Sequence, residues 1–175
     1  MPRAILTGGP GAGKSTLLRA LADEGLRVVN ESARAVIRER RAQGLSPRPE
    51  PLEFANEILR KDMENYRLAQ GSEGWAVYDR GAVEAIAGVH AVKPMSPHAL
   101  HELLRECQVE RVFILSPWPA IYMADEERDQ TAEEAGLVYE RVLSWYQSAG
   151  YNPIELPQCS VPERVSLVLH ALSAA

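Results

Sequence analysis

The chain has 175 residues, of which 46% are hydrophobic and 25% are charged, and this length and composition are typical of one domain with one apolar core. With a net charge of -5, nothing indicates a surface that wraps a polyanion, so we do not expect nucleic acid as the main partner. No apolar run approaches the roughly 18 residues of a membrane span, and the first residues lack the form of a signal peptide. We therefore expect residues 1–175 to form a single cytoplasmic domain.

Five short apolar or β-branched runs alternate with helical patterns along the chain. The runs predict strands at residues 3–7, 26–29, 75–78, 111–115 and 153–156. Helices are predicted at residues 14–22, 32–41 and 52–66, after Pro97, from Thr131 and from Ser160, and the last two have a Glu three residues later, at capping-box spacing. Because parallel strands need crossover connections, the alternation predicts a three-layer α/β/α fold with a parallel sheet.

Residues 8–15 read Gly-Gly-Pro-Gly-Ala-Gly-Lys-Ser, which satisfies the phosphate-binding pattern G-x-x-x-x-G-K-[ST] between a strand and a helix. Glycines let consecutive backbone N–H groups turn toward one anion, and the N-terminus of the helix adds positive potential. Lys14 is placed to reach the outer phosphates, and the Ser15 hydroxyl to bind Mg²⁺. We therefore expect ATP and Mg²⁺ to be held by Gly9, Pro10, Gly11, Ala12, Gly13, Lys14, Ser15 and Thr16. The alternative is a glycine-rich turn that binds nothing.

Two acidic residues follow or end predicted strands. Asp79 comes after the third strand and is followed by Arg80, and Glu31 comes after the second strand. Open α/β sheets bind their ligands at the carboxyl ends of the strands, so both carboxylates are predicted to face the phosphate site. Asp79 can bind the metal together with Ser15, or accept a proton from an attacking hydroxyl, while Arg80 can balance phosphate charge. Which acid is the catalytic base stays open. The alternative for Asp79 is a strand-end ion pair or a helix cap, and the alternative for Glu31 is a helix N-terminal acid.

A polar segment at residues 117–131 follows the fourth strand. It includes Arg128, which we expect to close over the nucleotide and neutralise charge on the transferred phosphoryl group. The alternative for Arg128 is an ion pair at a solvated helix entry. His98 and His101 have no third metal ligand apparent in the sequence and are interpreted as surface histidines.

The order of the motifs resembles that of a known family. The motifs are GGPGAGKST, VVNESAR, YDRG, SPWP followed by DEER, and LPQCSVPERV. Together they resemble bacterial P-loop ATPases of the AAA-like, kinase-related type over nearly the whole chain. More distantly, the Glu-x-x-Arg at Glu31 and Arg34 is similar to the ribosylnicotinamide kinase domain. Asp79 and Arg80 are similar to the acid-arginine pair of deoxynucleoside and thymidylate kinases.

The resemblance implies a five-stranded sheet in the order 2-3-1-4-5, a lid after the fourth strand, and an adenine-contacting loop near residues 158–162. It also implies that Glu31 is an acceptor-side base or, with Arg34, a substrate ligand, and that Arg80 and Arg128 bind phosphate. Where relatives carry an Asp soon after the Asp-Arg-Gly motif, this chain has Glu84. A role that depends on the shorter side chain is therefore not carried over.

These features favour a kinase over a hexameric motor or a GTPase. No Asp-Glu pair closes the third predicted strand, and the sequence has no N/T-K-x-D guanine-selecting element. We predict an ATP- and Mg²⁺-dependent phosphotransferase or ATPase whose partner is a small nucleoside- or nucleotide-like acceptor. The alternative is a nucleotide-dependent switch for a macromolecular partner. Neither the identity of the acceptor nor the oligomeric state follows from the sequence.

Overall fold

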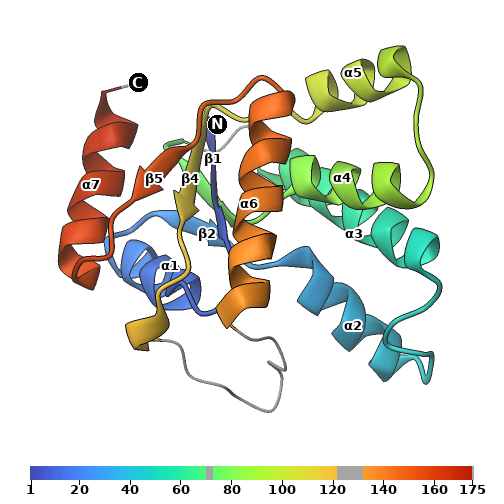
Figure 1. Cartoon of the computed structure of the whole chain (residues 1–175), viewed down its shortest axis with the longest axis horizontal. Helices are drawn as coiled ribbons and strands as arrows, with labels where there is room; N and C mark the ends of the chain where they lie inside the picture. Colours follow the sequence, from blue (N-terminus) through green and yellow to red (C-terminus); the bar gives the residue numbers. More distant parts are fainter. Residues whose placement is uncertain (70–72, 122–131, 175) are drawn as a thin grey trace. The chain divides into compact units, whose positions relative to one another are not determined.

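The computed structural model of the chain describes residues 1–69, 73–121 and 132–174. Strands and helices alternate along the chain as the sequence predicts (Figure 1). The elements are β1 (Arg3–Gly8), α1 (Lys14–Asp23), β2 (Arg27–Val29), α2 (Ser32–Ala42), α3 (Pro51–Leu68), β3 (Ala76–Asp79), α4 (Ala82–Val92), α5 (Pro97–Glu106), β4 (Arg111–Leu115), the 3-10 turn η1 (Pro119–Ile121), α6 (Ala132–Ser148), β5 (Ile154–Leu156) and α7 (Val161–Ser173).

The five strands form one parallel sheet in the order β2-β3-β1-β4-β5. This order confirms both the predicted fold class and the order that the family resemblance implies. The register pairs Leu6 of β1 with Asp79 of β3, and Gly8 of β1 with Leu115 of β4. Because the strands are parallel, their carboxyl ends lie at one edge of the sheet, where α/β folds bind ligands.

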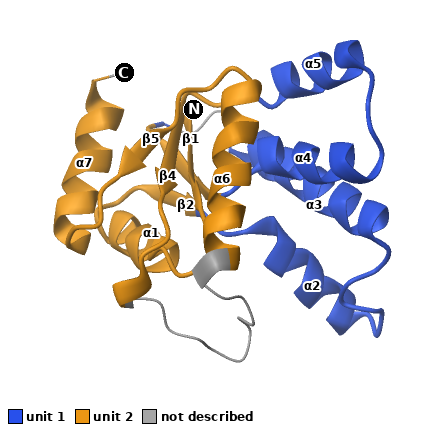
Figure 2. Cartoon of the chain, in the orientation of Figure 1, with its two compact units in different colours: residues 1, 29–73, 80–108 blue, residues 2–28, 74–79, 109–175 orange. Residues whose placement is uncertain are grey.

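The chain divides into two compact units (Figure 2). One unit consists of residues 2–28, 74–79 and 109–175 and holds most of the sheet with α1, α6 and α7; we call it the sheet unit. The other consists of residue 1 with residues 29–73 and 80–108, and holds α2, α3, α4 and α5; we call it the helical unit. That residues 1–175 act as a single domain stays a prediction.

The core of the sheet unit lies between the sheet and helices α1 and α7. Alternate residues of β1 and β4 point into it, as the period of two of a strand requires. On the helices, the inward residues recur every three or four positions. Figure 1 shows α1 and α7 on one side of the sheet and α6 on the other. The buried members of this core are Ala4, Leu6, Ala12, Leu17, Leu18, Leu21, Val77, Phe113, Leu115, Leu156, Val165, Val168 and Leu172.

Helix α4 of the helical unit is a described helix that the sequence pattern did not predict. It reads AVEAIAGVHAV and is apolar around most of its circumference, with five buried residues, so it lacks the amphipathic period that identifies a surface helix. It packs on α3, where a Cβ built on Gly88 would lie 3.6 Å from the Cβ of Ala55. In the described part of the chain, no helix has both the length and the apolarity needed to cross a membrane.

Candidate active site

The loop between β1 and α1 has the shape that its glycines permit. Gly13 adopts a left-handed backbone with φ of 86° and forms the N-cap of α1, a conformation that favours glycine. Gly8 lies so close to β4 that an added Cβ would collide with the carbonyl oxygen of Leu115, and one on Gly9 would lie 2.7 Å from the carbonyl oxygen of Ala135. The loop is thus fixed at its start by neighbouring backbone.

Lys14 folds back over the beginning of this loop. Its ammonium group donates hydrogen bonds to the carbonyl oxygens of Gly8 and Gly9, at 3.1 and 3.0 Å. These bonds hold the Nζ atom above the loop and place a positive charge at its mouth. A phosphate in the loop would lie beside that charge.

The N-terminus of α1 fits an anionic ligand. Within the described residues, no side chain caps this helix, and its first turn contains no acidic residue. The first N–H groups of an uncapped helix lack intrahelical partners, and the helix dipole adds positive potential at this end. Ser15 and Thr16 are in the first turn, and Thr16 is exposed. The backbone amides, the Lys14 charge and the hydroxyl groups together fit a polyphosphate.

Asp79 is an acidic residue of the same unit at the same sheet edge. It ends β3, in register with Leu6, which lies two residues before the loop begins. Its carboxylate and the Ser15 hydroxyl are hard oxygen groups of the kind that Mg²⁺ selects. The two residues therefore suit the predicted metal site.

Arg164 of α7 is a residue of this site that the sequence reasoning missed. Its Nη1 donates to the carbonyl oxygen of Ala12 at 2.9 Å and its Nε to that of Pro157 at 2.8 Å. The guanidinium carbon lies 4.8 Å from the centre of the Trp118 ring, and Arg164 is only 2% exposed. One feature of the sequence could have indicated it: Arg164 lies on the apolar face of α7, between Val161 and Val168, where a charged residue is unexpected.

The helical unit contains a second group of charged residues. Arg80 forms ion pairs with Glu31, at 3.4 Å, and with Glu84, at 2.7 Å, and Glu31 also pairs with Arg34 at 3.1 Å. Arg80 has a backbone φ of 64°, which is uncommon for a residue other than glycine. The structure thus brings together the predicted site residues Glu31, Arg34 and Arg80. Glu84, the residue that differs from the family pattern, pairs with Arg80.

A buried polar cluster in the same unit supports the start of α2. Ser32 is the first residue of that helix, and its hydroxyl donates to Asp62 at 2.5 Å and accepts from the Asn65 amide at 3.2 Å. Burial, aided by Glu84 and Glu31 and opposed by the Ser32 hydrogen bond, raises the pKa of Asp62 to about 7. The sequence reasoning missed this cluster because its members come from two helices.

Residues 3–164 match the profile of a protein family described as an AAA domain. The chain belongs to this family. Three solved structures are similar over 99% of the chain. Deoxyadenosine kinase from M. mycoides with products bound is 14% identical, with a TM-score of 0.66, and all of that chain is covered. NadR protein in complex with NAD and AMP-PNP is 14% identical, with a TM-score of 0.68, and 50% of that chain is covered. Shikimate kinase from Acinetobacter baumannii in complex with shikimate is 18% identical, with a TM-score of 0.54, and 94% of that chain is covered. No curated protein matches the sequence.

These similarities establish the fold of this AAA-domain protein as the nucleotide-binding P-loop fold of kinases and ATPases. The resemblance to kinase-related P-loop ATPases is thereby confirmed. The chain spans the whole of the deoxyadenosine kinase and half of NadR. At such low identities the similar structures show the fold alone.

The predicted site residues of this AAA-domain protein do not all belong to one compact unit. The phosphate-binding loop and Asp79 belong to the sheet unit, whereas Glu31, Arg34 and Arg80 belong to the helical unit, and their sharing of one cleft stays a prediction. Arg128 lies outside the described residues, so the lid also stays a prediction. His98 and His101 are exposed on α5. No group of three or more His, Cys, Asp or Glu side chains in the described ranges is arranged to hold a metal ion.

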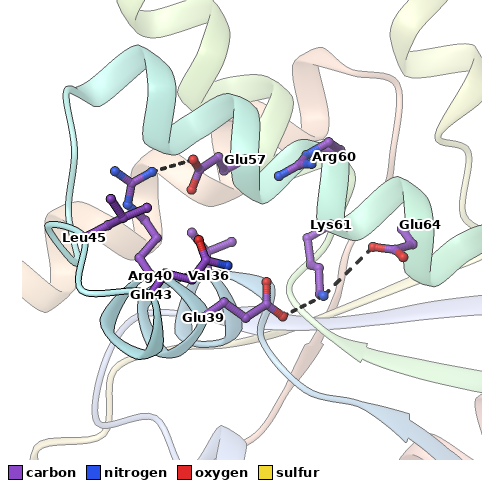
Figure 3. A pocket seen from close by; sticks show the side chains of 9 residues that line it. All are labelled: Val36, Glu39, Arg40, Gln43, Leu45, Glu57, Arg60, Lys61 and Glu64. Atoms are coloured by element: carbon purple, nitrogen blue, oxygen red, sulfur yellow. Dashed lines mark hydrogen bonds and ion pairs between the residues drawn. The ribbon is translucent and has the colours of Figure 1, made fainter.

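A hollow of about 160 Å³ lies between α2 and α3 in the helical unit (Figure 3). Ion pairs join its walls: Arg40 contacts Glu57 at 2.5 Å, and Lys61 contacts Glu39 at 2.7 Å. These pairs link the two helices across the hollow. The residues that line it are Val36, Glu39, Arg40, Gln43, Leu45, Glu57, Arg60, Lys61 and Glu64.

Proposed function

We propose that the protein is an ATP- and Mg²⁺-dependent phosphotransferase that acts on a small nucleoside- or nucleotide-like acceptor. The observation that carries the proposal is the loop at residues 8–15. Lys14 folds over its start, and at its end is the N-terminus of α1, which no side chain of the described residues caps. This arrangement binds the phosphates of a nucleotide through backbone N–H groups and one positive charge.

The residues of the sheet unit would bind and orient the nucleotide. The loop amides and Lys14 hold the phosphates, while Ser15 and Asp79 provide oxygen ligands for Mg²⁺. The metal, when bound, neutralises charge on the phosphate oxygens. Catalysis of phosphoryl transfer is largely positioning and charge stabilisation, which matches a site built from backbone amides and fixed charges.

The residues of the helical unit would serve the acceptor. The acceptor oxygen forms a bond to the γ-phosphorus as the bond to the ADP oxygen breaks, and the acceptor proton passes to a carboxylate. Glu31 suits this step because Arg34 and Arg80 orient its oxygens; Asp79 is the other candidate base. Arg80, held between Glu31 and Glu84, and Arg128 would stabilise charge on the transferred group.

The similar structures support a small acceptor. Deoxyadenosine kinase and shikimate kinase are kinases named for small molecules, and the NadR structure holds AMP-PNP with NAD. An acceptor of nucleoside or nucleotide type is the class that agrees with the motif resemblance at Glu31, Arg34, Asp79 and Arg80.

The test is ADP release from ATP and Mg²⁺, first with the protein alone and then with a panel of nucleosides, nucleotides and ribosylnicotinamide. Lys14→Ala serves as the blank because it lacks the charge over the loop. Stimulation by one panel member would support a kinase and name its substrate class. A slow rate that no acceptor changes would contradict the proposal and favour a nucleotide-dependent switch for a macromolecular partner.

A further inference from the structure

Arg164 is a buried cation in an unfavourable position. It lies in the first turn of α7, where its N–H bonds the carbonyl oxygen of the N-cap residue Ser160, and the positive end of a helix dipole disfavours a cation there. Only 2% of the residue is exposed. A guanidinium group keeps its charge in a protein, so this charge is withdrawn from water at a cost in free energy.

The contacts of Arg164 do not neutralise this charge. In the described part of the chain, they are the carbonyl oxygens of Ala12 and Pro157, the Trp118 ring and the neighbouring Cys159, with no carboxylate among them. Burial accordingly lowers the pKa of Arg164, and Cys159 opposes this effect. A buried charge without a counterion is destabilising unless a ligand provides one.

The bond to Ala12 also sets the direction of a peptide group in the loop. In a planar trans peptide, the C=O and N–H groups point to opposite sides, and the described chain has no cis peptide bonds. The Ala12 oxygen points to Arg164, so the N–H of Gly13 in the same peptide points away from it. That N–H belongs to the N-cap of α1, next to the helix end that fits an anion.

We infer that Arg164 is a positioning residue of the phosphate-binding loop. Arg164 holds the Ala12–Gly13 peptide so that its N–H faces the polyphosphate, and the charge of Arg164 strengthens polyphosphate binding. The inference rests on the proposed nucleotide binding. Pro157 and Trp118 fix the guanidinium from the loops that follow β5 and β4. Three loops at the carboxyl edge of the sheet are thereby joined by one side chain.

The test measures binding of MgATP and of inorganic tripolyphosphate by titration calorimetry. Arg164→Met removes the donors and the charge, and should raise both dissociation constants by roughly ten- to a hundredfold, the loss typical of a charged hydrogen bond. Arg164→Lys keeps the charge but cannot bond both carbonyl oxygens in the same geometry, and should bind both ligands with intermediate affinity. Arg19→Met removes an exposed cation of α1 and should bind both as the wild type does.

Two results would overturn the inference. One is an Arg164→Met protein that unfolds cooperatively and binds tripolyphosphate within about twofold of the wild type. The other is a variant that loses affinity for MgATP but not for tripolyphosphate, which would assign Arg164 to the base of the nucleotide. If Arg164→Met does not fold, the same two criteria apply to Arg164→Lys. A wild-type protein that binds both ligands but transfers no phosphoryl group would refute the proposed reaction and leave the inference standing.

Discussion

Replacing Asp62 by Asn should stabilise the protein above neutral pH. Asp62 is buried and hydrogen-bonded to Ser32, and its pKa rises from 3.8 to about 7 in the folded chain. A difference of about three pKa units corresponds to about 4 kcal/mol, at about 1.4 kcal/mol for each unit. Asn keeps a side chain of the same shape that can bond Ser32, but it never carries the charge.

The sign of the pH dependence follows from the raised pKa. Below pH 3.8 the carboxyl group is protonated in the folded and unfolded chains, and its full contribution to stability is present. Between pH 3.8 and about 7 the carboxyl group is deprotonated in the unfolded chain but still protonated in the folded chain, so the contribution of Asp62 to the free energy of unfolding falls as the pH rises. Above about pH 7 this contribution is lost. Asp62→Asn should therefore match the wild type near pH 4 and exceed it at about pH 8 by up to about 4 kcal/mol.

Urea unfolding of both proteins between about pH 4 and about pH 8 measures this difference. Comparing the two proteins at each pH removes the titration of all other groups. Glu64→Gln, which removes an exposed carboxylate from the same helix, controls for the change in net charge. A difference between Asp62→Asn and the wild type that is the same at both ends of the range would refute the reasoning.

Three further variants test the proposed site. Lys14→Ala should weaken MgATP binding by at least about tenfold in calorimetry, because it removes the charge over the loop; unchanged affinity would contradict its role. Asp79→Asn should retain much of the nucleotide affinity but reduce turnover by roughly a hundredfold or more, and turnover equal to that of the parent would exclude Asp79 from the mechanism. Glu31→Gln should slow ADP release only when an acceptor is present. If basal hydrolysis falls equally, Glu31 does not act on the acceptor.

The parts of the fold that the sequence predicted are those set by local pattern. The strands have β-branched runs, the loop has a fixed motif, and the capping box of Ser160 and Glu163 is present as its spacing predicted. Helix α4 was missed because a helix that is buried on most sides shows no amphipathic period.

The parts of the site that were missed depend on distant pairs. Arg164 and Ala12 are 152 positions apart, and Ser32 and Asp62 are 30 apart, so no local spacing marks either pair. A single sequence gives the residue types but not which of them meet. Arg80 and Glu31 are likewise far apart in the sequence, whereas Arg80 and Glu84 are only four positions apart and were missed because helix α4 was not predicted.

The backbone of Arg80 has a consequence for which residues this position accepts. A left-handed conformation, with φ of 64°, costs an ordinary residue about 1 kcal/mol and costs glycine almost nothing. On backbone grounds alone, random substitution would drift toward glycine or asparagine at this position. A residue that persists there against this bias must be kept for its side chain. Gly relieves this strain but removes the ion pairs with Glu31 and Glu84, so a deep mutational scan that selects only for folding should tolerate Arg80→Gly, whereas one that selects for function should retain the arginine.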